Sequence, residues 1–290
     1  MPASSQPAVV IRAATPKDGS VCGQICYDAF SKINSAHGFP CDFPGPERPT
    51  GILSMMFSSP GFYCVVAEVE DRIVGSNALD ERSIIAGVGP ITVDPSAQHL
   101  GVGRKLMEAV MGRARERSAG IRLVQAAFHN RSLALYTSLG FDVREPLSCV
   151  QGSTRERNIP GCVVRPAQAT DMDACNGLSR RVHGFDRGTD LAQSIEQKTA
   201  KVVERGGRIT GYATALAFSG HATAESNLDM QSLIASAESF AGPGILVPSR
   251  NSALLRWSLA NGLRVVQPMT LMSIGLYNEP AGAWLPSVLF

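Results

Sequence analysis

The stretch VDPSAQHLGVGRKLMEAV, residues 93–110, places two glycines between an apolar run and an amphipathic run. Glycine inside a helix costs about 1 kcal/mol relative to alanine, so Gly101 and Gly103 need a physical reason. Either they only close a turn, or a ligand comes very close to the backbone there. Because the bare amides of a helix N-terminus favour phosphates, the pair predicts a site for a phosphate-bearing ligand.

Two common phosphate-binding patterns do not fit this stretch. A Walker A loop requires G-x-x-x-x-G-K-[ST], which is absent, and a Rossmann fingerprint requires a third small residue where the chain has Leu106. What remains is a strand, a Gln, two residues and then Gly-x-Gly opening a helix.

Apolar and β-branched runs alternate with helical patterns around this stretch. Strands are predicted at 8–13, at 61–81 as a pair that turns near Asp71, at 87–95 and at 121–128. Helices are predicted at 15–30, 101–117 and 130–141. The Gly- and Pro-rich stretch 31–50 is predicted to be a long loop. This order predicts an α/β fold with a mixed, largely antiparallel sheet flanked by helices.

The pattern then begins again. Three pairs of segments match in the same order: 10–22 with 163–175, 71–75 with 207–211, and 130–141 with 251–263. A duplicated domain explains such an ordered set. We therefore predict a first domain at 9–150, a polar and turn-rich linker at 151–161, and a second domain at 162–290.

The two halves differ at the glycine pair. The second half has GHATAESNLDMQSLIASAESF at 220–240 and nothing like QHLGVG, and Trp257 stands at the place of Tyr136. We therefore predict that the second domain is degenerate and has no cofactor motif.

The segment QHLGVG resembles motif A of the GNAT superfamily of N-acetyltransferases, Q/R-x-x-G-x-G/A, which Gln98, Gly101 and Gly103 match. NRSLALYTSLGF resembles the second signature of that superfamily, an Asn followed by a Tyr and then Leu-Gly-Phe. The second half resembles the same fold with its cofactor motif lost. The resemblance implies a tandem GNAT protein that uses acetyl-CoA to acetylate a primary amine by direct attack, with the first domain catalytic and the second shaping the acceptor site.

The resemblance also implies which residues hold acetyl-CoA. The main chain of the strand before the loop would hold the pantetheine arm, Asn130 would hydrogen-bond it, and the loop amides would hold the pyrophosphate. Arg104 and Lys105 face either the phosphates or solvent. The full implied set is Ile91, Thr92, Val93, Gln98, His99, Leu100, Gly101, Val102, Gly103, Arg104, Lys105 and Asn130.

The implied acetyl transfer requires two further groups, a base for the amine and an acid for the leaving thiolate. A lysine-like amine has a pKa of about 10.4, so a base must remove a proton before the amine attacks. Glu81, at a predicted strand end, is the candidate base, and its alternative is a surface carboxylate. The leaving thiolate needs a proton, and a Tyr with a pKa of about 10 still carries one near neutral pH. Tyr136 fits by motif position, and its alternative is core packing.

The composition of the chain limits the classes of partner that we expect it to bind. A net charge of +2 over 290 residues gives no footprint for nucleic acid, and no apolar run approaches the roughly 20 residues of a membrane span. The first residues lack a signal-peptide pattern. Seven cysteines without C-x-x-C and five histidines without H-E-x-x-H predict reduced, mostly buried thiols, no metal and a cytoplasmic protein.

Two other functions stay open at this point. A non-catalytic CoA-sensing or interaction module would keep the fold, and a transferase could use a longer acyl-CoA. The motifs describe the cofactor end, so the acceptor is predicted only as a small-molecule or peptide amine. The sequence leaves the oligomeric state open.

Overall fold

The computed structural model describes residues 7–289, so residues 1–6, part of the stretch judged for a signal peptide, lie outside the described residues. Contacts divide the chain into two compact units: the first ends at Ile121 and the second begins at Arg122. Each unit is described by itself. Within residues 7–289, every helix is too short or too polar to cross a membrane.

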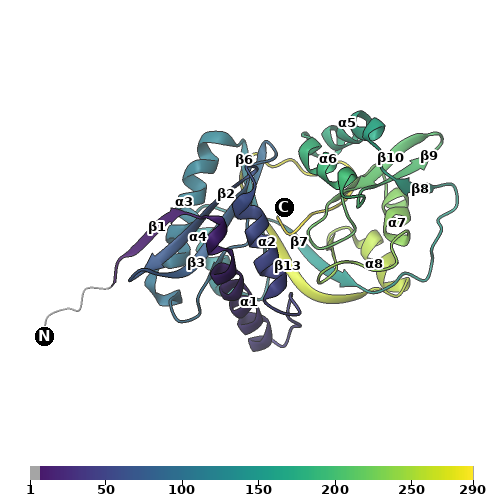
Figure 1. Ribbon diagram of the computed structural model, residues 1–290. Coiled ribbons are helices and arrows are strands. Elements are labelled where there is room, and N and C mark those ends of the chain that lie inside the picture. The colour runs from purple at the N-terminus through teal and green to yellow at the C-terminus, as the bar shows by residue number, and fades with distance from the viewer. Residues whose placement is uncertain (1–6, 290) are drawn as a thin grey trace, which may run out of the picture. The chain divides into compact units, whose positions relative to one another are not determined.

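The first unit is an antiparallel sheet covered by helices (Figure 1). Its strands, in sheet order, are β1 (Val9–Ala13), β2 (Phe62–Val69), β3 (Arg72–Asp80) and β4 (Ile85–Val88), and β5 (Thr92–Val93) pairs with β3. Its helices are α1 (Gly19–Ala36), α2 (Glu47–Ser58) and α3 (Val102–Arg117), with short 3₁₀ turns η1 (Pro16–Asp18) before α1 and η2 (Gln98–Leu100) before α3.

Helices α1 and α3 cover opposite faces of this sheet. Successive side chains of a strand point to opposite faces. In β3, Ser76 lies beside the thiol of Cys22 on α1, whereas the side-chain amide of Asn77 donates to the Leu106 carbonyl of α3 at 3.4 Å. The start of α3 is therefore held against β3 from the face that α1 leaves uncovered.

Two of the predicted elements are wrong. The predicted loop 31–50 is shorter, because α1 continues to Ala36 and α2 begins at Glu47. Pro49 lies in the first turn of α2, where the missing N–H of proline costs no intrahelical hydrogen bond, so the proline does not mark a loop. The predicted strand 87–95 is two strands, β4 and β5, separated at Gly89–Pro90, because proline cannot donate to a strand ladder.

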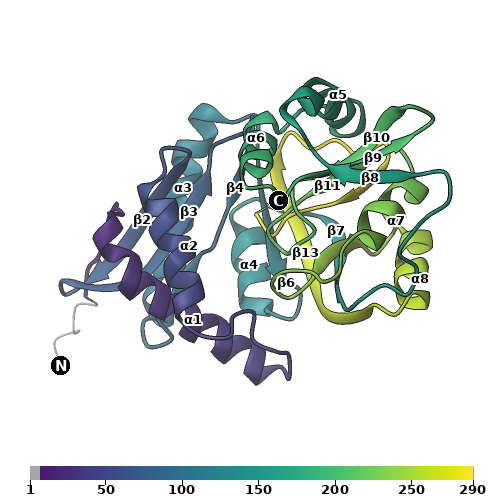
Figure 2. The ribbon, with the colours of Figure 1, turned by 45° about the vertical axis from the view of Figure 1, so that its right-hand side comes forward.

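The second unit contains two sheets. The first has the order β6 (Gly120–Ala126), β13 (Arg264–Gly275), β7 (Asp142–Gln151) and β12 (Ile245–Pro248). The second has the order β14 (Ala283–Leu285), β11 (Ala222–Ala224), β10 (Arg208–Ala213), β9 (Lys201–Arg205) and β8 (Val163–Pro166). Its helices are α4 (Asn130–Ser138), α5 (Met172–His183), α6 (Gly188–Glu196), α7 (Asn227–Ala235) and α8 (Ser252–Ala260), with the turn η3 (Ala169–Asp171) before α5. Helix α7 packs on β9 and β10 (Figure 2).

The duplication is visible in the order of the elements. The series β8, η3, α5, α6, β9 and β10 repeats β1, η1, α1, α2, β2 and β3. The same ion-pair cluster recurs in both series. Arg12 reaches Asp18 at 2.8 Å and Glu68 at 2.7 Å, and Arg165 reaches Asp171 at 2.7 Å and Glu204 at 2.6 Å. The matched Arg and Asp of the sequence therefore form one structural device that is built twice.

The compact units do not follow the border between the repeats. Strand β7, the last of the first repeat, pairs along its length with β13 and also with β12. Residues 122–151 therefore pack with the second repeat. The domain borders 9–150 and 162–290 describe the sequence repeats, and as domain borders they stay a prediction.

Candidate active site

Helix α3 starts from a glycine in the left-handed region. Gly101 is the N-cap residue, with φ 73° and ψ 11°, and as a glycine it has no side chain with which to cap the helix. A Cβ on Gly101 would meet nothing within 4 Å, so the backbone conformation, rather than crowding, favours glycine here. The amide of Lys105 donates to the Gly101 carbonyl at 3.3 Å, so regular helix bonding begins there.

The loop before α3 is held at both of its ends. The Asp94 carboxylate accepts from the amide of Ser96 at 2.8 Å and from its hydroxyl at 2.6 Å, which fixes the turn after β5. On the helix side, Val102 and Leu106 are fully buried. The sequence analysis did not single out Asp94, although Asp-Pro-Ser is a turn signal.

Strand β5 presents an edge that is not covered by another strand. Its partner is β3, through Gly75 with Val93 and Ser76 with Thr92, and among the described strands no other pairs with it. Gly75 permits this close approach, since a Cβ there would lie 2.6 Å from the Thr92 carbonyl. The Gln98 amide donates to the Val93 carbonyl at 3.4 Å, which ties the loop to β5.

The two basic residues in the first turn of α3, Arg104 and Lys105, have protein contacts. The ammonium of Lys105 donates to the Val9 carbonyl at 3.1 Å, and Arg104 lies 3.9 Å from Glu108, one turn along the helix. Both side chains are exposed, as is His99, whereas Leu100 is half-buried. Whether Arg104 and Lys105 face the phosphates or solvent stays a prediction.

Glu81 follows β3 directly and is engaged by α3. Arg113 donates to both of its carboxylate oxygens, with distances of 3.0 Å from Nε to Oε1 and 2.9 Å from Nη2 to Oε2. The Nε of Arg117 lies 3.3 Å from Oε1. Because both oxygens already accept from arginines, the contacts favour a structural ion pair over the role of a base.

Asn130 and Tyr136 belong to the second unit, on α4. Asn130 is the first residue of α4 and is exposed. Tyr136 is buried, with its ring edge-on to Phe141 at 6.2 Å between centroids. Burial raises the pKa of the Tyr136 phenol to about 12, against the opposing effect of a hydrogen bond with Ser132. The phenol therefore carries its proton throughout the physiological range.

In the second repeat, the corresponding helix is α7, and side chains of the protein itself lie at its N-terminus. Ser226 caps α7 by accepting from the amide of Asp229 at 3.3 Å. The carboxylate of Asp229 is fully buried and accepts from Arg205 at 2.8 Å, from Thr210 at 2.7 Å and from the Ser226 hydroxyl at 2.5 Å. A carboxylate already lies where the first repeat leaves its helix start without a side-chain cap.

Residues 60–143 match the family model of the acetyltransferase (GNAT) domain. The matched segment is similar to GNAT acetyltransferase domains. The matched range contains the loop before α3, Glu81, Asn130 and Tyr136. No curated protein matches the chain.

Solved structures of GNAT proteins resemble the chain over nearly its full length. An acetyltransferase candidate from Pyrococcus horikoshii has 18% identity and a TM-score of 0.73, covering 98% of this chain and 96% of its own. A GCN5-related N-acetyltransferase from Sphaerobacter thermophilus has 14% identity and a TM-score of 0.61, covering 93% and 96%. A tandem GNAT protein from the clavulanic acid biosynthesis pathway has 13% identity and a TM-score of 0.55, covering 92% and 98%. These likenesses confirm the predicted mixed α/β fold with two GNAT-like halves.

The cysteines of the chain are free thiols, and most of them are buried. All seven cysteines are free and five are buried, as predicted. Burial raises the pKa of Cys22 to about 11 and that of Cys64 to about 12, so both thiols stay protonated. Within residues 7–289, no three His, Cys, Asp or Glu side chains are grouped to hold a metal ion.

Proposed function

We propose that this GNAT protein transfers an acetyl group from acetyl-CoA to a primary amine, and that the first repeat is the catalytic one. The observation that carries the proposal is the start of α3, where left-handed Gly101 forms the cap without a capping side chain. The first amides of a helix lack intrahelical partners and carry roughly half a positive charge. They suit a pyrophosphate, and the open space around Gly101 admits one.

The residues present fit acetyl-CoA. The amides at the start of α3 would bind the pyrophosphate, except those of Leu100 and Lys105, which donate to the carbonyls of Ala97 and Gly101. The uncovered edge of Ile91–Val93 would hold the pantetheine arm, and Asn130 would hydrogen-bond that arm. When bound, acetyl-CoA supplies a thioester, which is an acyl group activated toward amines. Asp94 and Gly75 position the binding residues by fixing the turn and the spacing of β5.

Tyr136 would donate its Oη proton to the departing sulfur. Its place in the second motif assigns this role, and its raised pKa keeps the proton on the phenol until transfer. The same burial makes Tyr136 a weaker acid than a free tyrosine, so proton transfer requires direct hydrogen bonding to the sulfur.

The role of Glu81 toward the acceptor amine has two possible assignments, a base or a positioning residue. Glu81 is the candidate from the sequence, acting directly or through water. The contacts with Arg113 and Arg117 support a positioning role instead, in which Glu81 joins the end of β3 to α3. We favour the positioning role, and the second repeat is assigned to acceptor selection rather than to cofactor binding.

A thiol-release assay tests the function. Acetyl-CoA, propionyl-CoA and butyryl-CoA are each combined with a panel of amino acids, polyamines, aminoglycosides and peptide N-termini. Amine-dependent release of CoA from acetyl-CoA supports the proposal. Preference for a longer acyl group would correct the donor. Tight acetyl-CoA binding without release for any amine would favour a CoA-sensing module, and failure to bind any acyl-CoA would refute the cofactor assignment.

A further inference from the structure

Strands β5 and β11 have corresponding places in the two repeats. Gly75 of β3 pairs with Val93 of β5, and Gly211 of β10 pairs with Ala224 of β11. The sequence match of DRIVG with GRITG aligns Gly75 with Gly211. Val93 and Ala224 are therefore equivalent positions, each defined by pairing inside its own compact unit.

The main-chain groups of these two residues face the outer edges of their strands. In an antiparallel pair, the residues that exchange hydrogen bonds alternate along the strand. The amide of Asp94, next to Val93, donates to a carbonyl of β3 at 2.8 Å, and the amide of Glu225, next to Ala224, donates to a carbonyl of β10 at 2.9 Å. The N–H and C=O of Val93 and Ala224 therefore point away from β3 and β10.

The second repeat covers this outer edge with protein. Strand β14 pairs with β11 in antiparallel fashion, Ala283 with Ala224 and Leu285 with Ala222. In the first repeat, β5 pairs with β3 alone among the described strands. The edge of β5 is the one that we assign to the pantetheine arm. Strand β14 therefore lies on β11 where that arm would lie on β5.

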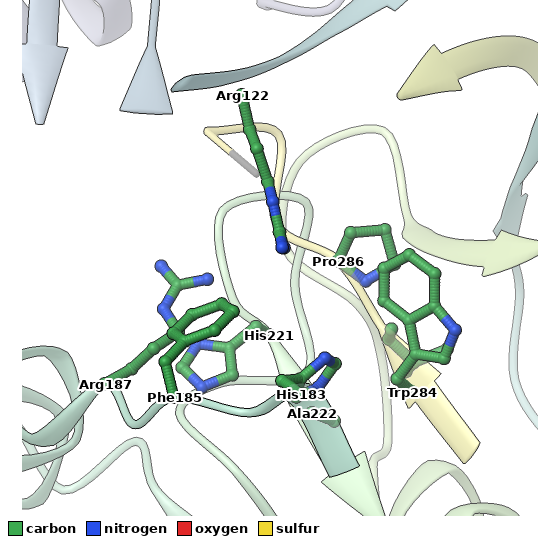
Figure 3. Close-up of a pocket in the computed structure, with 9 residues that line it drawn as sticks. Arg122, His183, Phe185, Arg187, His221, Ala222, Trp284 and Pro286 are labelled. Carbon is green, nitrogen blue, oxygen red and sulfur yellow. The ribbon is translucent and has the colours of Figure 1, made fainter. Parts of the chain in front are cut away.

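The segment that contains β14 is fixed along its length. Before the strand, the Ala281 amide donates to the Val182 carbonyl of α5 at 2.8 Å. Within it, the Trp284 ring packs edge-on against His183, at 5.9 Å between centroids (Figure 3). After it, the Val288 amide donates to a carbonyl of the loop between β10 and β11 at 2.8 Å. These contacts hold β14 against β11 without a ligand.

A protein group also lies at the counterpart of the pyrophosphate position. The carboxylate of Asp229 is fully buried at the start of α7, the helix that follows β11. In the first repeat, the helix that follows β5 is α3, where we place the pyrophosphate. The second repeat therefore has an uncharged main-chain segment on its strand edge and a negative charge at its helix start. A pantetheine arm and a pyrophosphate combine the same two features.

We propose that β14 substitutes for a pantetheine arm and closes the cofactor edge of the second repeat. An extended chain with amide groups can add to the edge of a sheet through main-chain hydrogen bonds. Strand β14 satisfies the edge groups of β11 permanently, so a ligand reaches them only when β14 is displaced. The likeness to pantetheine rests on the proposed function, whereas the closure of β11 by β14 does not.

Gly282 offers a local way to displace β14, because it lets the strand approach β11 closely. A Cβ on Gly282 would lie 2.5 Å from the Ala224 carbonyl oxygen and 3.1 Å from the Val182 side chain. Gly282→Ala should therefore force β14 away from β11. Gly177, on α5 of the same unit, is the matched control, since the nearest atom to its Cβ, on Arg181, lies at an ordinary 3.6 Å.

Hydrogen exchange of the full chain, resolved by residue, measures which amides are covered. In wild type without ligand, the amides of Ala222 and Ala224 should be protected and that of Val93 unprotected. In Gly282→Ala, the two β11 amides should lose about tenfold or more of their protection, and added pantetheine should restore it. Gly177→Ala should behave as wild type. Protection of the β9 amides shows that the second unit stays folded.

Three results would overturn the proposal. The first is exchange of the Ala222 and Ala224 amides in wild type as fast as that of Val93. The second is protection of these two amides that survives in Gly282→Ala. The third is failure of pantetheine to restore their protection. If Gly282→Ala unfolds the unit, Ala283→Pro replaces it, because proline removes the amide that faces Ala224.

Failure of the proposed function gives a different result. In that case the Val93 amide stays unprotected in wild type with saturating acetyl-CoA, whatever the amides of β11 do. In wild type, acetyl-CoA should leave the exchange of the β11 amides unchanged, since β14 already covers them. Added protection of β11 by acetyl-CoA would contradict the closure.

Discussion

Helices α3 and α7 occupy corresponding places in the two repeats, and they begin differently. Gly101 opens α3 in a left-handed conformation without a capping side chain. Ser226 opens α7 with a side-chain cap, and the buried carboxylate of Asp229 lies at the same helix start. Both arrangements answer the need of helix amides for negative partners. The second repeat meets this need with its own side chains, whereas in the first we propose that the pyrophosphate of acetyl-CoA meets it.

A second pair of positions shows the same contrast. In the second repeat, Asn251 caps α8 by accepting from the amide of Leu254 at 3.2 Å and bonds to Asn227 in both directions, at 2.8 Å and 3.0 Å. Its counterpart Asn130 is exposed at the start of α4. Positions that we assign to the cofactor in one repeat therefore make folding contacts in the other.

The largest effect is expected at the pair Tyr136 and Trp257. Tyr136→Phe should lower kcat by about 10²–10⁴-fold, because it removes a positioned acid, and should leave acetyl-CoA affinity unchanged. The control Trp257→Phe should keep wild-type kcat. Steady-state kinetics with calorimetry of acetyl-CoA checks both. Equal kcat for Tyr136→Phe and wild type, with chemistry rate-limiting, removes Tyr136 from the mechanism.

The second largest effect is expected on acetyl-CoA affinity when Gly103 of α3 is replaced. Gly103→Asp should weaken acetyl-CoA binding on the order of 100-fold, since a carboxylate would stand beside the pyrophosphate, and Gly103→Ala should cost less. Gly112 lies on the same helix with open space around it. Gly112→Asp is therefore the matched control and should keep wild-type affinity. Unchanged affinity in folded Gly103→Asp would contradict the phosphate site.

Both repeats contain the same Arg–Asp ion pair, and we expect its loss to lower stability in each repeat. Arg12 lowers the pKa of Asp18 to about 2, and Arg165 lowers that of Asp171. A carboxylate with a depressed folded pKa stabilises the fold above its unfolded pKa of about 3.9, and the stabilisation is lost as pH falls through the folded pKa. Asp18→Asn should lower the free energy of unfolding by about 2 kcal/mol at pH 7, and Asp171→Asn should lower it as well.

Denaturant unfolding at pH 7 and between pH 4 and pH 2 checks this pair. The difference between each variant and wild type should shrink across that acidic interval. If the difference in the free energy of unfolding between variant and wild type stayed constant down to pH 2, the two ion-pair clusters would not stabilise the fold through their charge.

The smallest effect is expected at Glu81. As a positioning residue, it should tolerate Glu81→Gln with kcat within about threefold of wild type and a stability loss of about 0.5–1 kcal/mol, typical of a partly exposed ion pair. A kcat loss of 100-fold or more, together with loss of the acidic limb of the pH–rate profile, would restore Glu81 as the base.

The order of strands and helices was predictable because hydrophobic alternation and helical spacing act locally. The loop predicted at 31–50 failed for a local reason too, since a proline in the first turn of α2 fits a helix as well as a loop. In the site, the two glycines marked the start of α3, because a left-handed N-cap favours glycine.

The contacts of Glu81 could not be predicted in this way. Arg113 lies 32 residues away in the sequence, and only the packing of α3 on β3 brings the two together. The small recess drawn in Figure 3 is similar, since its lining, which includes Arg122 and Trp284, comes from four separate stretches of the second unit. Spacing in the sequence reports neither ion pairs nor cavities that tertiary packing creates.

The central claim is that the first repeat binds acetyl-CoA and the second does not. Isothermal titration of the full chain with acetyl-CoA, in the absence of amine, measures this directly. We predict one site per chain, and loss of that site in Gly103→Asp. Two sites per chain, or one site that Gly103→Asp leaves at full affinity, would contradict the account.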